Sequence, residues 1–379
     1  MTSGAAQVVS GAQVDLSSRS QPAESALCLE GVTRRYADNV VLDAISLSLP
    51  SNEYVSLLGP SGSGKTVLLR LIAGFEVPDA GRITMGGKRI DDVAAHRRGI
   101  GFVFQNFALF PHLNVFDNIA FGLVHGEGAA RIDGPPGRAR VADMIALVGL
   151  NGLERRGVHE ISGGQRQRVA LARTMVTQPR LVLLDEPLGA LDANLRARMR
   201  EELRNLRERL GVTFLHVTGS ETEALAMGDH VIVLDRGRIS QFDVPDAIYS
   251  RPATPEVARS LNCYNLFAGQ SGADGFSCAH ALFATSRVKV KCAQPTYAIR
   301  HDLISFAPQE ETSLPDRTGL LAKFVTSEYS GSTIRHFFEV GTGQIVEVEN
   351  HLSHRRPADL EPGRAYSLTW AVDDAVVFG

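Results

Sequence analysis

The chain contains little of what would indicate a disulfide scaffold, a zinc site or a membrane span. It has 379 residues and only four cysteines, Cys28, Cys263, Cys278 and Cys292. No two of them have the Cys-x-x-Cys spacing of zinc ligands, and their small number fits a reducing compartment. No apolar run approaches the roughly 20 residues that a membrane-spanning helix requires.

An excess of charge of one sign is also missing. The 39 basic and 42 acidic residues leave a formal net charge of -3 at pH 7. This balance gives no electrostatic reason to expect a nucleic acid or an anionic membrane surface as a partner. Residues 1–26 are rich in Ser, Ala and Gly and lack the apolar core of a secretory signal, so we expect a flexible tail there.

Between residues 27 and 240, short apolar runs alternate with helical patterns. The runs YVSLLG, LVLLDE, VTFLHVT and HVIVLD predict strands, and the first three have the composition of strands buried on both faces. Within 193–210, Met199 and several leucines recur at helical spacing, which predicts one buried face and one solvated, arginine-rich face. Strands that alternate with helices predict an α/β domain with a largely parallel sheet.

The pattern changes in the last third of the chain. The segments LAKFVTSEYSGSTIRHFFEV, QIVEVEN and AYSLTWAVDDAVVF are rich in β-branched and aromatic residues and are separated by glycines. Such short segments are typical of a small all-β barrel or sandwich. We therefore predict an α/β domain at 27–240, a linker at 241–264 and a β domain at 265–379.

The stretch GPSGSGKT follows the first predicted strand and precedes the apolar run VLLRLIAG. It matches the P-loop pattern in full, because its glycines let backbone N–H groups face a phosphate. Lys65 would reach the β- and γ-phosphates of a nucleotide, and Thr66 would offer a hydroxyl to Mg²⁺. The helix expected next favours an anion at its N-terminus. The predicted ATP-binding residues here are Gly59, Pro60, Ser61, Gly62, Ser63, Gly64, Lys65 and Thr66.

Two carboxylates end the strand predicted in LVLLDEP. Asp185 is placed to hold Mg²⁺, directly or through water, and Glu186 to polarise an attacking water. Alone, such a pair is as often a turn or a helix cap. Here it follows ISGGQRQRVALARTM, where Ser162, Gly163 and Gly164 open a helix with a second N-terminus that can receive an anion.

With these motifs the chain resembles the ATP-binding cassette (ABC) proteins from about residue 27 to 379. SGGQ, which ends at Gln165, resembles the family signature, and Gln105 in GFVFQ resembles the Q-loop glutamine, a catalytic and metal-binding residue. Tyr36 matches the aromatic residue that stacks on adenine, and Asp192 ends a stretch, LGALD, that matches the D-loop.

The resemblance implies an α/β P-loop NTPase domain with a helical subdomain at about 106–175, followed by an OB-like all-β accessory domain. It also implies a homodimer that encloses two ATP molecules. Each ATP would lie between the P-loop of one subunit and the signature helix of the other.

The stretch GIGFVFQNFALFPHLNVFDNIAFGL resembles the importers served by binding proteins, in particular those for polyamines and ferric iron. In these the residues after the Q-loop glutamine receive a helix of the membrane subunit, and Phe107, Phe110 and Pro111 are the candidates here. Ordinary core positions are the alternative for each. The resemblance implies ATP and Mg²⁺ as cofactors, and two permease subunits and, indirectly, a solute-binding protein as partners, without nucleic acid. It places the chain on the cytoplasmic face of the bacterial inner membrane.

Two stretches depart from the family pattern. HGEGAARIDGPPGRAR places two glycines and two prolines at 134–137, where a helix would continue, and proline pairs end helices. In FLHVTGSETEAL, the histidine that would contact the γ-phosphate is replaced by Gly219. His216 lies roughly 10 Å earlier along an extended strand and on its opposite face, so we expect it to be a core histidine.

These observations predict the ATP-hydrolysing subunit of a bacterial importer for a polyamine, ferric iron or a similar small solute. Two alternatives stay open. The glycine at position 219 suggests a nucleotide-dependent switch that binds ATP and turns it over weakly. A soluble ABC protein that acts on nucleic acid would carry the same motifs, although the single motif set and the near-neutral charge argue against it.

Overall fold

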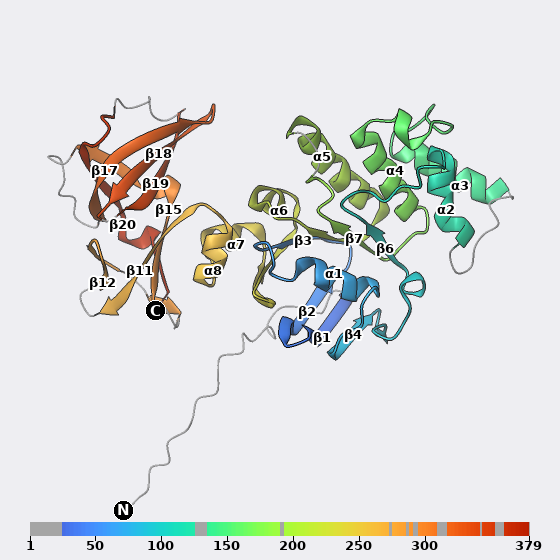
Figure 1. Cartoon of the computed structure of the whole chain (residues 1–379), viewed down its shortest axis with the longest axis horizontal. Coiled ribbons are helices and arrows are strands. Elements are labelled where there is room, and N and C mark those ends of the chain that lie inside the picture. Colours follow the sequence, from blue (N-terminus) through green and yellow to red (C-terminus); the bar gives the residue numbers. More distant parts are fainter. Residues whose placement is uncertain are drawn as a thin grey trace, which may run out of the picture.

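The computed structural model describes residues 25–125, 135–189, 193–272, 275–285, 288–290, 295–308, 317–341, 343–352 and 360–378. Figure 1 shows two bodies side by side, which we call the α/β unit (described residues of 25–243) and the β unit (described residues of 264–378). The short helices α7 (Pro245–Ser250) and α8 (Pro255–Ser260) lie between them. None of the described helices is long and apolar enough to cross a membrane.

A six-stranded sheet forms the centre of the α/β unit. Its strands, in spatial order, are β10 (Arg238–Asp243), β9 (His230–Asp235), β3 (Tyr54–Leu58), β8 (Thr213–Val217), β7 (Leu181–Asp185) and β6 (Ile100–Val103). All neighbours are parallel except the pair β9–β10. Every residue of β3 and β8 is buried, which confirms the prediction of strands covered on both faces.

A second, antiparallel sheet packs beside the first. It contains, in spatial order, β2 (Asn39–Pro50), β1 (Ser25–Tyr36), β4 (Ala80–Met85) and β5 (Lys88–Arg89). Helix α1 (Lys65–Ala73) buries most of its residues in the apolar cluster that these two sheets share. The loop before α1 is therefore fixed on both sides by packed elements.

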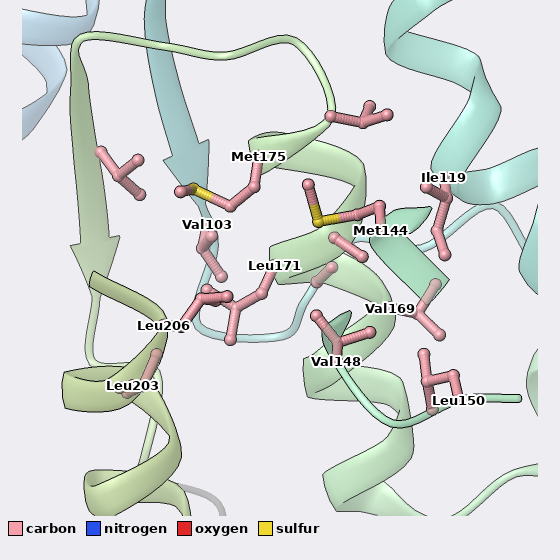
Figure 2. Close-up of a cluster of buried hydrophobic side chains, with 14 of the residues drawn as sticks. Val103, Ile119, Met144, Val148, Leu150, Val169, Leu171, Met175, Leu203 and Leu206 are labelled. Atoms are coloured by element: carbon pink, nitrogen blue, oxygen red, sulfur yellow. The ribbon is translucent and has the colours of Figure 1, made fainter. Parts of the chain in front are cut away.

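The remaining helices of the α/β unit enclose a separate apolar cluster. They are α2 (Val115–His125), α3 (Pro135–Leu147), α4 (Gly163–Met175), α5 (Ala193–Leu210) and α6 (Glu221–Met227). In Figure 2, Leu171 and Met175 of α4 face Leu203 and Leu206 of α5. Helix α3 begins at Pro135. Proline is tolerated there because the N–H groups of the first helical turn have no acceptor within the helix. Gly134 lies outside the described residues.

The β unit consists of two sheets around one aromatic core. The first contains β13 (Leu282–Phe283), β12 (Gly275–Cys278), β11 (Tyr264–Gly272), β15 (Thr296–Arg300), β21 (Val376–Phe378) and β14 (Val288–Val290), and the second β16 (Ser305–Pro308), β20 (Ala365–Ala371), β17 (Arg317–Tyr329), β18 (Thr333–Val340) and β19 (Gln344–His351). Trp370 is fully buried between them and donates its indole N–H to the hydroxyl of Tyr297 (2.7 Å). The last third of the chain is thus all-β, as predicted.

Candidate functional site

The predicted site residues follow neighbouring strands of the central sheet at one edge. The loop 59–64 follows β3, Asp185 ends β7, Gly219 stands two residues after β8, and Gln105 stands two residues after β6. Since β3, β8, β7 and β6 are adjacent and parallel, their carboxyl ends meet. This is the edge at which open α/β sheets bind ligands.

The loop before α1 has the backbone of a phosphate cradle. Gly62 and Gly64 have φ angles of 80° and 103°, which favour glycine. A Cβ on Gly59 would lie 2.1 Å from the carbonyl oxygen of Leu234, so no larger residue fits there. The N-terminus of α1 receives no hydrogen bond from a capping side chain. Its first N–H groups are therefore free of side-chain partners.

The ammonium group of Lys65 is folded back onto this loop. It donates to the carbonyl oxygens of Gly59 (2.7 Å) and Pro60 (2.9 Å). Burial lowers the pKa of Lys65, while Glu186 and Asp185 raise it. Ser61 is exposed, and the backbone carbonyl of Ser63 accepts a hydrogen bond from the N–H of Gly237 (3.1 Å).

Gln105 and Glu186 are brought together although 81 positions separate them. The side-chain amide of Gln105 donates to the carboxylate of Glu186 (3.1 Å). Glu186 has a φ of 44°, and its N–H donates to the carbonyl of Val217 (3.0 Å). A left-handed φ in a residue other than glycine is uncommon and is concentrated at functional sites. The backbone of Glu186 therefore has an uncommon conformation at the carboxyl end of the sheet.

Asp185 lies beside this pair and is half-buried. Burial and the neighbouring Glu186 raise its pKa, while Arg70, Lys65 and a hydrogen bond with Thr66 lower it. The carboxylates of Asp185 and Glu186 therefore repel each other. A cation bound beside Thr66 and Asp185 would relieve that repulsion.

At the end of β8, Gly219 leaves open space. A Cβ built on this residue would have no heavy atom within 4 Å, and its φ is not in the left-handed region. His216 does not fill the position, because it is fully buried and its Nδ1 lies 2.9 Å from the hydroxyl of Tyr54. Burial lowers its pKa to about 3. The prediction of a core histidine is confirmed.

Tyr36 ends β1 with its side chain 41% exposed. Its hydroxyl donates to the carboxylate of Glu76, and the guanidinium of Arg34 lies 4.8 Å from its ring centroid. Glu76 and Arg34 were not predicted to take part, and no local motif marks them because the contact with Glu76 spans 40 positions. The pair fixes the orientation of an exposed aromatic ring.

The helix start predicted at Ser162 is confirmed. Ser162 caps α4: its hydroxyl accepts from the N–H of Gln165 (3.3 Å), and the Gln165 side chain accepts from the N–H of Ser162 (2.8 Å). A Cβ on Gly163 would meet nothing within 4 Å, whereas one on Gly164 would lie 3.0 Å from Leu195. Asp192 lies outside the described residues.

The prediction that Phe107 is exposed for a partner helix is wrong. Its side chain is 8% exposed and belongs to the core of the helical region. The reason is a left-handed turn at Phe107 and Ala108, with φ angles of 63° and 46°, that directs the ring inward. Phe110 is half-buried against Phe121, with 4.2 Å between centroids, and Pro111 is exposed.

An exposed aromatic cluster that the sequence did not reveal lies beside Gln105. Phe75 and Phe104 are 49% and 37% exposed, with ring centroids 5.9 Å apart. Phe102 contacts both rings, at 5.3 Å and 4.4 Å. Phe75 follows α1 and the other two lie on or after β6, so only the folded sheet brings them together. Clustered exposed aromatic rings are typical of interaction sites.

Comparison with known proteins gives matches over both units. Residues 42–189 match the family model described as ABC transporter, and residues 297–378 match the TOBE domain. The spermidine/putrescine import ATP-binding protein PotA of Rubrobacter xylanophilus is 37% identical over 93% of this chain and 94% of its own length. The sulfate/thiosulfate import ATP-binding protein CysA of Xanthomonas campestris is 41% identical over 83% and 90%.

Solved structures show the same fold for the larger part of the chain. The structure of cbiO1 from Clostridium perfringens, part of the ABC transporter complex cbiONQ, has a TM-score of 0.55 and 28% identity over 63% of this chain and 95% of its own. A dimeric ATP-binding cassette in a post-hydrolysis state, bound to ADP and Pi, has a TM-score of 0.51 and 28% identity over 58% and 98%.

Proposed function

This chain belongs to the ABC transporter family of ATP-binding proteins, and we propose that it hydrolyses ATP to energise an importer. The observation that carries the proposal is the sheet edge at which the phosphate loop, Asp185 and the hydrogen-bonded pair Gln105–Glu186 meet. The relatives named above are import ATP-binding proteins, and they match this chain over most of its length.

We assign nucleotide binding to the loop 59–66 and to Tyr36. Lys65 would exchange its two carbonyl partners for phosphate oxygens, since a charge-assisted bond to phosphate is stronger than one to a neutral carbonyl. The uncapped amides of α1 would donate to the same phosphates. The ring of Tyr36, held by Glu76, would stack on adenine.

Glu186 is the proposed general base. Its carboxylate would accept a proton from water, and Gln105 would position that carboxylate through the hydrogen bond already present. The oxygen groups of Thr66, Asp185 and Gln105 suit Mg²⁺, which takes one or two carboxylates together with substrate phosphates. When bound, Mg²⁺ would neutralise charge on the β- and γ-phosphates.

We propose that two copies of the chain form the working unit. The N-terminus of α4 is exposed at Ser162, and no hydrogen bond among the described residues joins it to the phosphate loop. In a dimer, the N-terminus of α4 in one copy would contact the γ-phosphate bound to the other copy. The contacting residues would be Ser162, Gly163, Gly164 and Gln165. One solved relative is a dimer bound to ADP and Pi, which supports this arrangement. The D-loop residue Asp192 would lie at the same interface.

The proposed partners beyond the dimer are two permease subunits at the cytoplasmic face of the bacterial inner membrane. The aromatic cluster of Phe75, Phe102 and Phe104 adjoins Gln105 and offers the apolar anchors that a docking helix needs. The cargo would be a small ionic solute, since the matched relatives serve spermidine/putrescine or sulfate/thiosulfate. A separate solute-binding protein would select it.

The test is the variant Glu186→Gln in the purified chain. We expect ATP binding to persist, turnover to fall at least a hundredfold, and an ATP-bound dimer to accumulate in size-exclusion chromatography. Glu201→Gln, which removes an exposed carboxylate on α5, is the matched control and should behave as the parent. Parental turnover in Glu186→Gln would contradict the proposed function.

A further inference from the structure

A cavity of about 270 Å³ lies between α4 and α5, away from the nucleotide edge. Its walls come from the turn after α3, from α4 and from α5. The floor is apolar and is formed by Leu147, Val148, Leu171, Met199, Leu203 and Leu206. Figure 2 shows Leu171 of α4 on the side that faces Leu206 of α5. The volume is just below the range of about 300–1,000 Å³ that is typical of small-molecule sites.

The mouth of this cavity is polar and carries more positive than negative charge. Arg168 and Arg209 stand there with Glu202 and Asn205. Arg168 donates from Nη1 to the carbonyl of Val148 (3.2 Å), while its Nε lies 3.8 Å from the Glu202 carboxylate. That buried Nε makes no hydrogen bond. The mouth thus holds two guanidinium groups and one carboxylate, and the Nε of Arg168 has no hydrogen-bond acceptor among the described residues.

We propose that this cavity binds a small amphiphilic carboxylate, with its alkyl chain on the leucine floor and its carboxylate between Arg168 and Arg209. A carboxylate accepts paired N–H donors from a guanidinium, and two guanidinium groups stand at this mouth. The apolar floor excludes a fully polar anion such as phosphate, because burying its charge there would go uncompensated. A cationic amphiphile would meet two like charges.

Occupation of the cavity would act on ATP turnover, and this second step rests on the proposed function. Arg168 and Leu171 lie on α4, whose first residues form the signature exposed for the partner's nucleotide. A ligand wedged between α4 and α5 would oppose movement of α4 against the sheet. The binding itself needs no nucleotide, so it can be tested separately.

The experiment is calorimetric titration of the whole chain with octanoate in the absence of nucleotide. Arg209→Glu reverses a charge at the mouth, and we expect it to weaken octanoate binding at least fivefold. Arg198→Glu makes the same change at an exposed position of α5 outside the cavity and should alter affinity less than twofold. Octylamine should bind the parent at least tenfold more weakly than octanoate. Leu206→Phe should reduce octanoate binding by filling the floor.

Equal octanoate binding by the parent, Arg209→Glu and Leu206→Phe would overturn the proposal, as would the absence of binding to the parent. ATP turnover measured with and without saturating octanoate tests the second step. We expect at least a twofold change in the parent and none in Arg209→Glu. Binding without any change in turnover would overturn the regulatory step but would still support the proposed binding site. An inactive parent that still binds octanoate would contradict the proposed function alone.

Discussion

The N-termini of α1 and α4, which we propose bind phosphate, are built differently. Helix α1 begins behind Gly64 without any side-chain cap, and Lys65 lies on the carbonyls of its own loop. Helix α4 begins with a complete capping box between Ser162 and Gln165. The first leaves its donors for an external anion, whereas in the second the capping box already pairs the N–H groups of Ser162 and Gln165 and does not use those of Gly163 and Gly164. We infer that α1 offers its donors to a nucleotide of its own subunit and that α4 is preformed for use by another subunit.

Among the variants that test this comparison, we expect the largest effect from a substitution at the N-terminus of α1. Lys65→Ala removes the side-chain cation of the phosphate loop, and we expect ATP affinity to fall about a hundredfold, since a hydrogen bond to a charged group is among the strongest. Titration with a fluorescent ATP analogue measures the loss. Lys88→Ala removes an exposed lysine of β5 and should bind as the parent. Near-parental affinity in Lys65→Ala would refute the assignment of the loop.

We expect a smaller effect, on ATP turnover, from adding a hydrogen-bond donor at position 219. Gly219 has open space around it and an ordinary φ, so Gly219→His fits without strain. A well-placed donor at developing charge is worth on the order of 10²–10³ in rate. We expect at least a tenfold gain in ATP turnover, measured at steady state, with ATP affinity little changed.

Gly219→Ala is the matched control for this variant. It adds the Cβ and the same loss of backbone freedom without a donor, so it should leave turnover within twofold of the parent. An equal gain in Gly219→Ala and Gly219→His would show that backbone stiffening, and not hydrogen bonding, limits the parent. No gain in either would show that another group already stabilises the γ-phosphate.

The sequence predicted whatever depends on neighbours along the chain. The strands β3, β7, β8 and β9, the helix start at Ser162 and the α/β and all-β classes of the two units are confirmed. Apolar runs and capping residues are local signals, so periodicity suffices to find them. The buried state of His216 followed from strand alternation and is also confirmed.

What the sequence did not reveal depends on long-range contacts or on an unusual backbone. Phe107 was misjudged because its left-handed φ has no glycine to signal it. The Tyr36–Glu76 hydrogen bond and the Phe75–Phe104 contact join distant segments. The apolar cluster that joins the two units likewise combines Leu58 and Val231 of the α/β unit with Phe378 at the end of the chain. None of these pairings leaves a periodic pattern.

We expect the smallest effect from a substitution that removes the N-terminal cap of α4. Ser162→Ala removes the cap, and we expect the free energy of unfolding to fall by about 1 kcal/mol, the usual value of such a cap. Thr254→Ala is the matched control, because the Thr254 hydroxyl caps α8 in the same way, accepting from the N–H of Val257 (3.3 Å), away from the nucleotide edge. Both variants should lose similar stability in a urea titration.

The two variants should differ only when ATP brings two copies together. If α4 serves the partner's nucleotide, Ser162→Ala should also lower turnover severalfold, since it removes a hydroxyl that would face the γ-phosphate and loosens the first turn of the helix. Thr254→Ala should leave turnover unchanged at a temperature where both proteins are folded. Equal turnover in the two variants would mean that the cap of α4 serves the stability of its own helix and nothing more. The contrast between the two N-termini would then reflect helix capping alone and not a division of labour between subunits.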